Sequence, residues 1–181
     1  MKKNDAFLKE IHPIIFFGLC CALMAILLGF ILGGIFGGAE DSLKEWLDRA
    51  GTIVLESVYK SDVAAKDLVV KKSWEYFKRA HMHWGAIGSA ALTSILALIL
   101  LCRSARTAQV TVALLGVGSL VYPSFWLCSG IFAPQMGGTD VAKEYFYFLG
   151  KPGAAFCILG LGGTLLCVIR DRFAGSNKNA S

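Results

Sequence analysis

The histidine pair in His81-Met82-His83 is the feature of this sequence closest to a site for chemistry. Histidine is the most common transition-metal ligand in proteins and a frequent axial ligand of haem. On a helix, residues two apart point about 200° away from each other, so the two imidazoles are not expected to hold one ion together. We expect His81 to face the protein interior on the side of Phe77 and Trp84. The alternative is an interfacial His81 that hydrogen-bonds lipid headgroups or loop carbonyls.

Haem and copper are the cofactors that these histidines suggest. Carboxylates such as Glu56 could complete a metal site with His81 and His83, because carboxylate oxygen is an ordinary metal ligand. The only other histidine, His12, precedes the first apolar segment, about 30 Å from His81 across the membrane. These two histidines therefore cannot share a haem, and a haem at His81 would need Met82 or another subunit as its second ligand.

Two further residues could help to bind a quinone or an anionic group near His81. Tyr122 stands beside Pro123, which interrupts helical hydrogen bonding in the third apolar segment and leaves a polar, kinked region. Lys151 precedes Pro152 at the start of the fourth segment, where a helix amino terminus adds positive potential. The alternatives are hydroxyl groups satisfied by local bonds and a lysine that extends to the interface to fix the helix end.

The six cysteines give no pattern of a metal or redox site. They fall in or at the ends of the apolar segments, and none belongs to a Cys-x-x-Cys pair. Cysteine behaves as a small hydrophobic residue when buried. We therefore interpret these cysteines as packing residues.

Four long apolar segments must position these residues. Hydrophobic residues make up 55% of the 181-residue chain and charged residues only 17%, against about 25% charged in ordinary globular domains. A helix needs about 20 mostly apolar residues to cross a bilayer, and runs such as 90–101 lack the alternation of a barrel strand. The sequence therefore predicts an all-α integral membrane protein, a four-transmembrane-helix bundle in a single domain over residues 1–181. The predicted spans are residues 14–36, 84–102, 107–132 and 149–169.

Residues 40–80, between the first two spans, are predicted to form a helical extramembrane cap. Leu43, Leu47 and Ala50 recur at helical spacing, and charged residues occupy the opposite face. A break is expected at Lys60-Ser61, with Ser61 as the N-cap of a second helix. That helix is predicted to run from residue 62 to residue 102, so that its first half projects from the membrane.

The distribution of charge predicts orientation and partners. The net charge of +5 resides in the two tails and in the short loop that contains Arg103 and Arg106. Basic segments remain in the cytoplasm, so we expect both termini to be cytoplasmic in a bacterial inner membrane. The basic surface suggests contact with the lipid bilayer, and no basic-aromatic surface suggests nucleic acid. Small residues spaced four apart, such as Gly29 and Gly33, indicate tight packing between helices, with other membrane subunits or a homo-oligomer as expected partners.

No motif in the sequence defines a reaction. The first hypothesis for function is a non-catalytic subunit or interaction protein of a membrane complex. The second is a redox- or metal-associated membrane protein that uses His81 with haem, copper or quinone. The third is a small-solute transporter. Such proteins usually place ionisable groups at mid-membrane, and none of the predicted spans has one there.

Overall fold

The structure is a computed structural model that describes residues 12–102 and 104–178. Over these residues the chain is almost entirely helical and contains no strand. The helices are α2 (Pro13–Ile53), α3 (Val63–Leu101), α4 (Ala105–Met136), α5 (Thr139–Tyr145) and α6 (Tyr147–Lys178). Four of them, α2, α3, α4 and α6, are long and apolar enough to cross a bilayer. The prediction of an all-α protein is therefore confirmed, and four of its helices have the length and hydropathy that the predicted membrane spans require.

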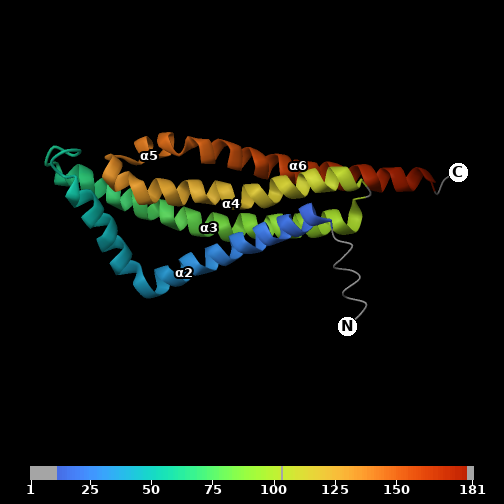
Figure 1. Cartoon of the computed structure of the whole chain (residues 1–181), viewed down its shortest axis with the longest axis horizontal. Coiled ribbons are helices and arrows are strands. Elements are labelled where there is room, and N and C mark those ends of the chain that lie inside the picture. Colours follow the sequence, from blue (N-terminus) through green and yellow to red (C-terminus); the bar gives the residue numbers. More distant parts are fainter. Residues whose placement is uncertain (1–11, 103, 179–181) are drawn as a thin grey trace.

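The four long helices lie side by side as an elongated bundle, with α4 in contact with α2, α3 and α6 (Figure 1). One end carries Cys102 and Ser104, which lie between α3 and α4, and is called the Cys102 end below. The opposite end carries the turn at residues 54–62 together with α5, and is called the Tyr59 end. Four long helices run along the bundle in alternating directions, so α2 begins and α6 ends at the Cys102 end.

The bundle has a hydrophobic core in each half. Near the Cys102 end, Ile95 and Leu98 of α3 pack with Val112 and Leu115 of α4. In the other half, larger residues of α2 and α3 fill the interior, and these are Leu32, Leu47, Phe77 and Trp84. Many large apolar side chains outside these clusters are exposed, as expected for helices that face lipid.

Helix α2 is kinked at Ala39, where the backbone leaves helical geometry (φ −145°, ψ 27°). The apolar half before the kink diverges from α3, and the half after it returns to the bundle at the Tyr59 end (Figure 1). In this returning half, residues 40–53, Leu47 and Ala50 are buried, whereas Ile53 is 81% exposed. The amphipathic helix predicted here is present. It is continuous with the first spanning helix.

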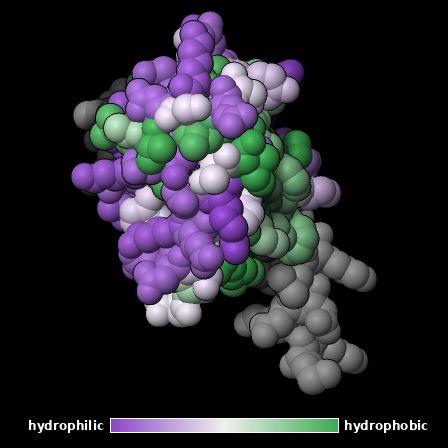
Figure 2. All heavy atoms as spheres, turned by 90° about the vertical axis from the view of Figure 1, so that its left-hand side faces the viewer, coloured by the Kyte–Doolittle hydropathy of each residue, from purple (hydrophilic) through white to green (hydrophobic). Residues whose placement is uncertain are grey.

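At the Tyr59 end, the turn at residues 54–62 contacts the end of α4. The Tyr59 hydroxyl donates a buried hydrogen bond of 2.7 Å to the carbonyl oxygen of Pro134. Burial raises the pKa of Tyr59, so its phenol keeps the proton that it donates. Gly137 ends α4 with a positive φ of 78°, and Val58 lies against it. Figure 2 looks onto this end and shows hydrophilic residues over much of the face, with hydrophobic residues along one flank.

Helix α3 begins as one long helix, as predicted, but its N-cap is Asp62. The Asp62 carboxylate accepts a hydrogen bond of 2.9 Å from the backbone N–H of Ala65. Ser61 lies one residue earlier, with a left-handed backbone (φ 65°). Both residue types are good N-caps, so the register of the turn decides between them.

An ion pair holds the returning half of α2 against α3. The Lys66 ammonium group of α3 lies 2.6 Å from an Asp48 carboxylate oxygen and 3.1 Å from one of Asp67. The Lys66 side chain is only 8% exposed, and its stem packs on Gly51 of α2. The charged face of the amphipathic helix is therefore partly turned toward the protein.

Candidate functional site

His81 faces α2, on the side of the bundle predicted for it. Its Nδ1 lies 2.8 Å from the carbonyl oxygen of Gly29. The ring packs against Gly33, where an added Cβ would be 2.7 Å from His81 Cε1, and edge-on to Phe36 with ring centres 5.5 Å apart. The glycines of α2 thus make room for the imidazole, which is half-buried.

His83 lies on the opposite side of α3 and faces α4. Its Nδ1 lies 2.7 Å from the carbonyl oxygen of Arg79, one turn earlier. Its ring meets Tyr122 edge-on at 5.4 Å and lies 6.2 Å from Trp126. The two histidines therefore occupy separate environments, as their spacing on the helix requires.

The hydrogen bonds place a proton on Nδ1 of both histidines. A carbonyl oxygen can only accept, so Nδ1 is the donor in each ring, and Nε2 has a free lone pair in the neutral form of the imidazole. This arrangement, with Nδ1–H donated to a carbonyl, is common in metal-binding histidines. Each Nε2 can accept a hydrogen bond or bind one metal ion, but the two cannot act on the same atom.

The other residues predicted for the site are dispersed. Tyr122 is in contact with His83, but the Lys151 ammonium group lies over the ring of Tyr147, 4.2 Å from its centre. Glu56 is an exposed residue in the turn at residues 54–62. Within the described part of the chain, the group of three potential metal ligands within reach of one ion contains neither histidine nor Glu56.

The hydroxyl groups of α4 near Pro123 are mostly satisfied by their own helix. Ser119 Oγ donates to the carbonyl of Gly116 at 2.8 Å, and Ser124 Oγ donates to that of Leu120 at 2.7 Å. Among the described residues, Trp126 Nε1 is buried and has no hydrogen-bond partner, although it lies beside His83. Trp84 Nε1 and Ser129 Oγ are likewise buried without a hydrogen-bond partner in the described part of the chain.

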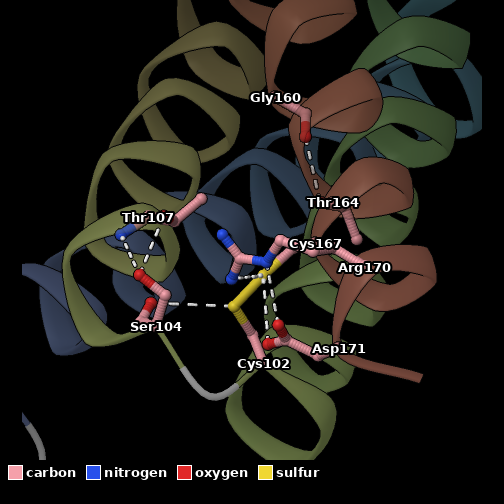
Figure 3. The surroundings of a disulfide bond; sticks show 8 residues. All are labelled: Cys102, Ser104, Thr107, Gly160, Thr164, Cys167, Arg170 and Asp171. Carbon is pink, nitrogen blue, oxygen red and sulfur yellow. Dashed lines mark hydrogen bonds and ion pairs between the residues drawn. A yellow bond between two sulfur atoms is a disulfide. The ribbon is translucent and has the colours of Figure 1, made fainter. Parts of the chain in front are cut away.

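A disulfide bond between Cys102 and Cys167 is the chemical group that the sequence interpretation missed (Figure 3). Cys102 follows the last residue of α3, and Cys167 lies near the end of the fourth span, with Cα atoms 5.9 Å apart. The predicted spans, residues 84–102 and 149–169, each have one of these cysteines at or near the end that was expected in the cytoplasm. That shared depth was the signal available in the sequence, but depth alone does not give the rotation of the two helices.

Two charged residues of α6 surround the buried sulfur of this pair. Arg170 Nη2 and Asp171 Oδ2 each lie 3.9 Å from Cys167 Sγ. Arg170 Nε also donates to Asp171 Oδ1 at 2.9 Å. On the other side, the Ser104 carbonyl oxygen is 3.6 Å from Cys102 Sγ. In Figure 3 these groups converge on the disulfide from α6 and from the start of α4.

The same residues form the one three-ligand group found in the described chain. Donor atoms of Cys102, Cys167 and Asp171 lie within 4.8 Å of one another. The disulfide ties up both sulfurs, however, and the Arg170 cation beside Cys167 opposes a second cation there. The arrangement therefore favours sulfur redox chemistry over metal binding.

Comparison with known proteins found no family model, no curated protein and no solved structure that matches this chain. Its function must be argued from the described residues alone.

Proposed function

We propose that this protein is a non-catalytic subunit or interaction protein of a bacterial inner-membrane complex, with its termini and its Cys102 end in the cytoplasm. The observation that carries this proposal is a small-residue surface on α2 that no other helix in the described part of the chain covers. It consists of Gly34, Gly37 and Gly38, and is called the glycine surface below. An added Cβ at any of the three would meet nothing within 4 Å.

Most other glycines in the spans mark places where two helices meet. An added Cβ at Gly29 would lie 3.0 Å from the backbone of Gly85, and one at Gly116 would lie 2.9 Å from the Cα of Gly18. Absence of a side chain lets two backbones approach closely, which favours helix association in lipid. The glycine surface has the same composition and the i, i+3, i+4 spacing of one helix face, and it lies where α2 diverges from the bundle. A transmembrane helix of another chain would fill it in the way that α3 and α4 fill the others.

A second copy of this protein is the partner that the glycine surface fits best. A face with glycines four apart is complementary to itself across a two-fold axis, because each copy offers the same groove. The exposed residues around it are large and apolar, with Phe30 74% and Ile31 50% exposed. They supply the van der Waals contacts that would surround the close glycine approach.

An extramembrane position of residues 40–80 is part of the same proposal, and the length of α3 supports it. Helix α3 has 39 residues and is therefore roughly 58 Å long, whereas the hydrocarbon core is about 30 Å thick. Its charged first half, together with the returning half of α2, would stand beyond the bilayer as a helical cap. The hydrophilic face in Figure 2 is the face that this cap would present to the periplasm.

Cysteine placed on the glycine surface is expected to cross-link two copies. In Gly34→Cys or Gly38→Cys, the two introduced sulfurs would meet across the two-fold axis and yield a covalent dimer under mild oxidation in membranes. The measurement is non-reducing gel electrophoresis. Gly162→Cys is the matched control, since an added Cβ at Gly162 also meets nothing within 4 Å but lies on α6.

Dimer in both Gly34→Cys and Gly38→Cys, and none in Gly162→Cys or the parent protein, would support the proposal. Equal cross-linking of all three variants would indicate random collision in the membrane and would contradict it. Failure of Gly34→Cys and Gly38→Cys to cross-link would rule out the second copy as the partner at this surface.

A cofactor-binding function is the second candidate, and His81 favours it, because its Nδ1 donates to the Gly29 carbonyl and leaves Nε2 to bind a metal. If haem, copper or iron is bound through His81, the detergent-purified protein is expected to show a haem absorption band or near-stoichiometric metal. His81→Ala should lose the signal, and His12→Ala should keep it. A colourless, metal-free parent protein would exclude a tightly held cofactor.

A further inference from the structure

We propose that Cys102 and Cys167 form a reversible dithiol–disulfide couple that exchanges with small thiols, with Arg170 and Asp171 as its positioning residues. The proposal rests on the arrangement in Figure 3, where the two sulfurs of one bond have different surroundings. A disulfide that serves only as a link between α3 and α6 needs neither a cation nor a carboxylate beside one of its sulfurs.

Exposure selects the sulfur that a thiol can attack. Cys102 is half-buried at the end of α3, whereas Cys167 is only 2% exposed. Thiol–disulfide exchange requires the attacking sulfur to approach in line with the bond, so access decides which sulfur reacts. An external thiolate would therefore attack Cys102 Sγ.

Charge favours the other sulfur as the leaving group. When the bond breaks, its electron pair passes to Cys167 Sγ, which becomes a thiolate. The Arg170 guanidinium lies 3.9 Å from this atom, and this cation stabilises the thiolate when the Asp171 carboxyl, at the same distance, carries a proton. Attack at Cys102 and departure at Cys167 are thus favoured by separate features of the site.

Asp171 is placed to handle the proton of Cys167. Its Oδ2 is 3.9 Å from Cys167 Sγ, and its side chain is 8% exposed. As a carboxylate it can accept the Cys167 proton when the disulfide forms, and as a carboxylic acid it can return the proton when the disulfide is reduced. Arg170 holds this carboxyl in position through the bond from Nε to Oδ1.

The reaction balances with two small thiols as the reductant. The first thiolate joins Cys102 in a mixed disulfide and releases Cys167. The second thiolate attacks the sulfur of the first small thiol in that mixed disulfide. Cys102 is released, and the two small thiols leave joined as a small-molecule disulfide. Two protons from the small thiols end on Cys102 and Cys167, and two electrons pass to the protein. Oxidation by the small-molecule disulfide is the reverse.

The cytoplasmic location of the Cys102 end, which is part of the proposed function, makes reversibility relevant. Disulfides in the cytoplasm are usually transient, because cellular thiols reduce them. Location can be tested separately with Arg106→Cys, labelled from either side of the membrane by an impermeant maleimide. If labelling occurs from the periplasm, the proposed orientation is wrong, and the exchange chemistry is still decided by the experiment below.

The test is differential alkylation of the full-length protein in membranes that have been equilibrated with glutathione buffers of increasing reducing strength. Mass spectrometry of the peptides that contain Cys102 and Cys167 gives the oxidised fraction of each. We expect both to convert together, reversibly, within the range that glutathione buffers cover. Cys128, which is free, is the internal control and should stay a thiol throughout.

The rate of disulfide reduction in variants then tests the positioning residues Arg170 and Asp171. Arg170→Gln and Asp171→Asn are each expected to slow reduction about tenfold, through loss of thiolate stabilisation and of proton transfer respectively. Arg170→Lys should restore most of the rate because it keeps the cation, which a purely structural role would not predict. Asp140→Asn, an exposed carboxylate in α5, should have no effect.

A pair that stays oxidised at every glutathione ratio, or that reduces at the same rate in Arg170→Gln, Asp171→Asn and the parent protein, would overturn the proposal. The bond would then be a fixed link between α3 and α6.

Discussion

Replacing Gly153 by alanine is expected to lower the free energy of unfolding by about 1–3 kcal/mol, the usual cost of adding a methyl group where no space exists. Gly153 of α6 lies directly on the backbone of α4. An added Cβ would be 2.7 Å from the backbone nitrogen of Tyr122 and 2.8 Å from its Cα. Backbone atoms cannot rotate away as a side chain can, so α6 would have to move away from α4.

Gly162→Ala is the matched control for this prediction. Gly162 is on the same helix, and its added Cβ would meet nothing within 4 Å. Because alanine has a higher helix propensity than glycine, this variant should be unchanged or stabilised by up to about 1 kcal/mol. Unfolding in mixed detergent micelles, followed by circular dichroism, gives both values. Equal stability of Gly153→Ala and Gly162→Ala would mean that the close contact between α6 and α4 is absent.

The membrane helices could be predicted from the sequence because bilayer thickness sets a minimum length for each apolar run. The opposed faces of His81 and His83 could be predicted as well, because the rotation per residue of a helix is fixed. Both predictions depend on one helix at a time and on regular geometry. They needed no knowledge of how two helices are rotated about their axes.

Features that depend on pairs of helices could not be predicted in this way. Pairing of Cys102 with Cys167 requires that α3 and α6 turn the two residues toward each other, which their similar depth does not reveal. The kink at Ala39 returns α2 to the bundle, and no proline marks it. Helix α5 has only seven residues, which is too short for a periodic pattern. The clearest local indication of a helix there is the pair Asp140 and Lys143, which are three residues apart and form an ion pair.

The same limit applies to the predicted site. His83 and Tyr122 come together because α3 and α4 are neighbours, which the loop between their spans made probable. Lys151 belongs to α6, and its position over Tyr147 follows from the local geometry of that helix start. Prediction of a site assembled from several helices therefore requires the arrangement of the bundle, whereas the opposed directions of the two histidines follow from α3 alone.

Replacing Asp48 by alanine is expected to lower the free energy of unfolding by about 1–3 kcal/mol, because it removes the shorter of two ion pairs to the buried Lys66 ammonium group. Loss of a hydrogen bond to a buried charge costs about this much. We expect a loss in the lower part of this range, because the Asp48 side chain is 49% exposed and the Asp67 carboxylate remains 3.1 Å from the Lys66 ammonium group.

Lys66→Met provides the contrasting variant. Methionine fills most of the lysine volume against Gly51 and carries no charge that needs a partner, so the change in stability should stay within about 1 kcal/mol. In the double variant, Asp48→Ala should cost little beyond Lys66→Met alone, because the charge that Asp48 satisfies is gone. The measurement is a double-mutant cycle by unfolding in mixed micelles.

Additive losses in this cycle would mean that Asp48 acts through something other than Lys66. Strong coupling would instead identify the ion pair as the contact that fixes the returning half of α2 on α3. Leu47 and Ala50 of that half are buried as well, so it should stay packed on α3 when Lys66→Met removes the charge, and come loose when Asp48→Ala leaves the charge without its shorter ion pair. Proteolysis within residues 40–62 should accordingly be faster in Asp48→Ala than in Lys66→Met, which distinguishes local release of this segment from general loss of stability.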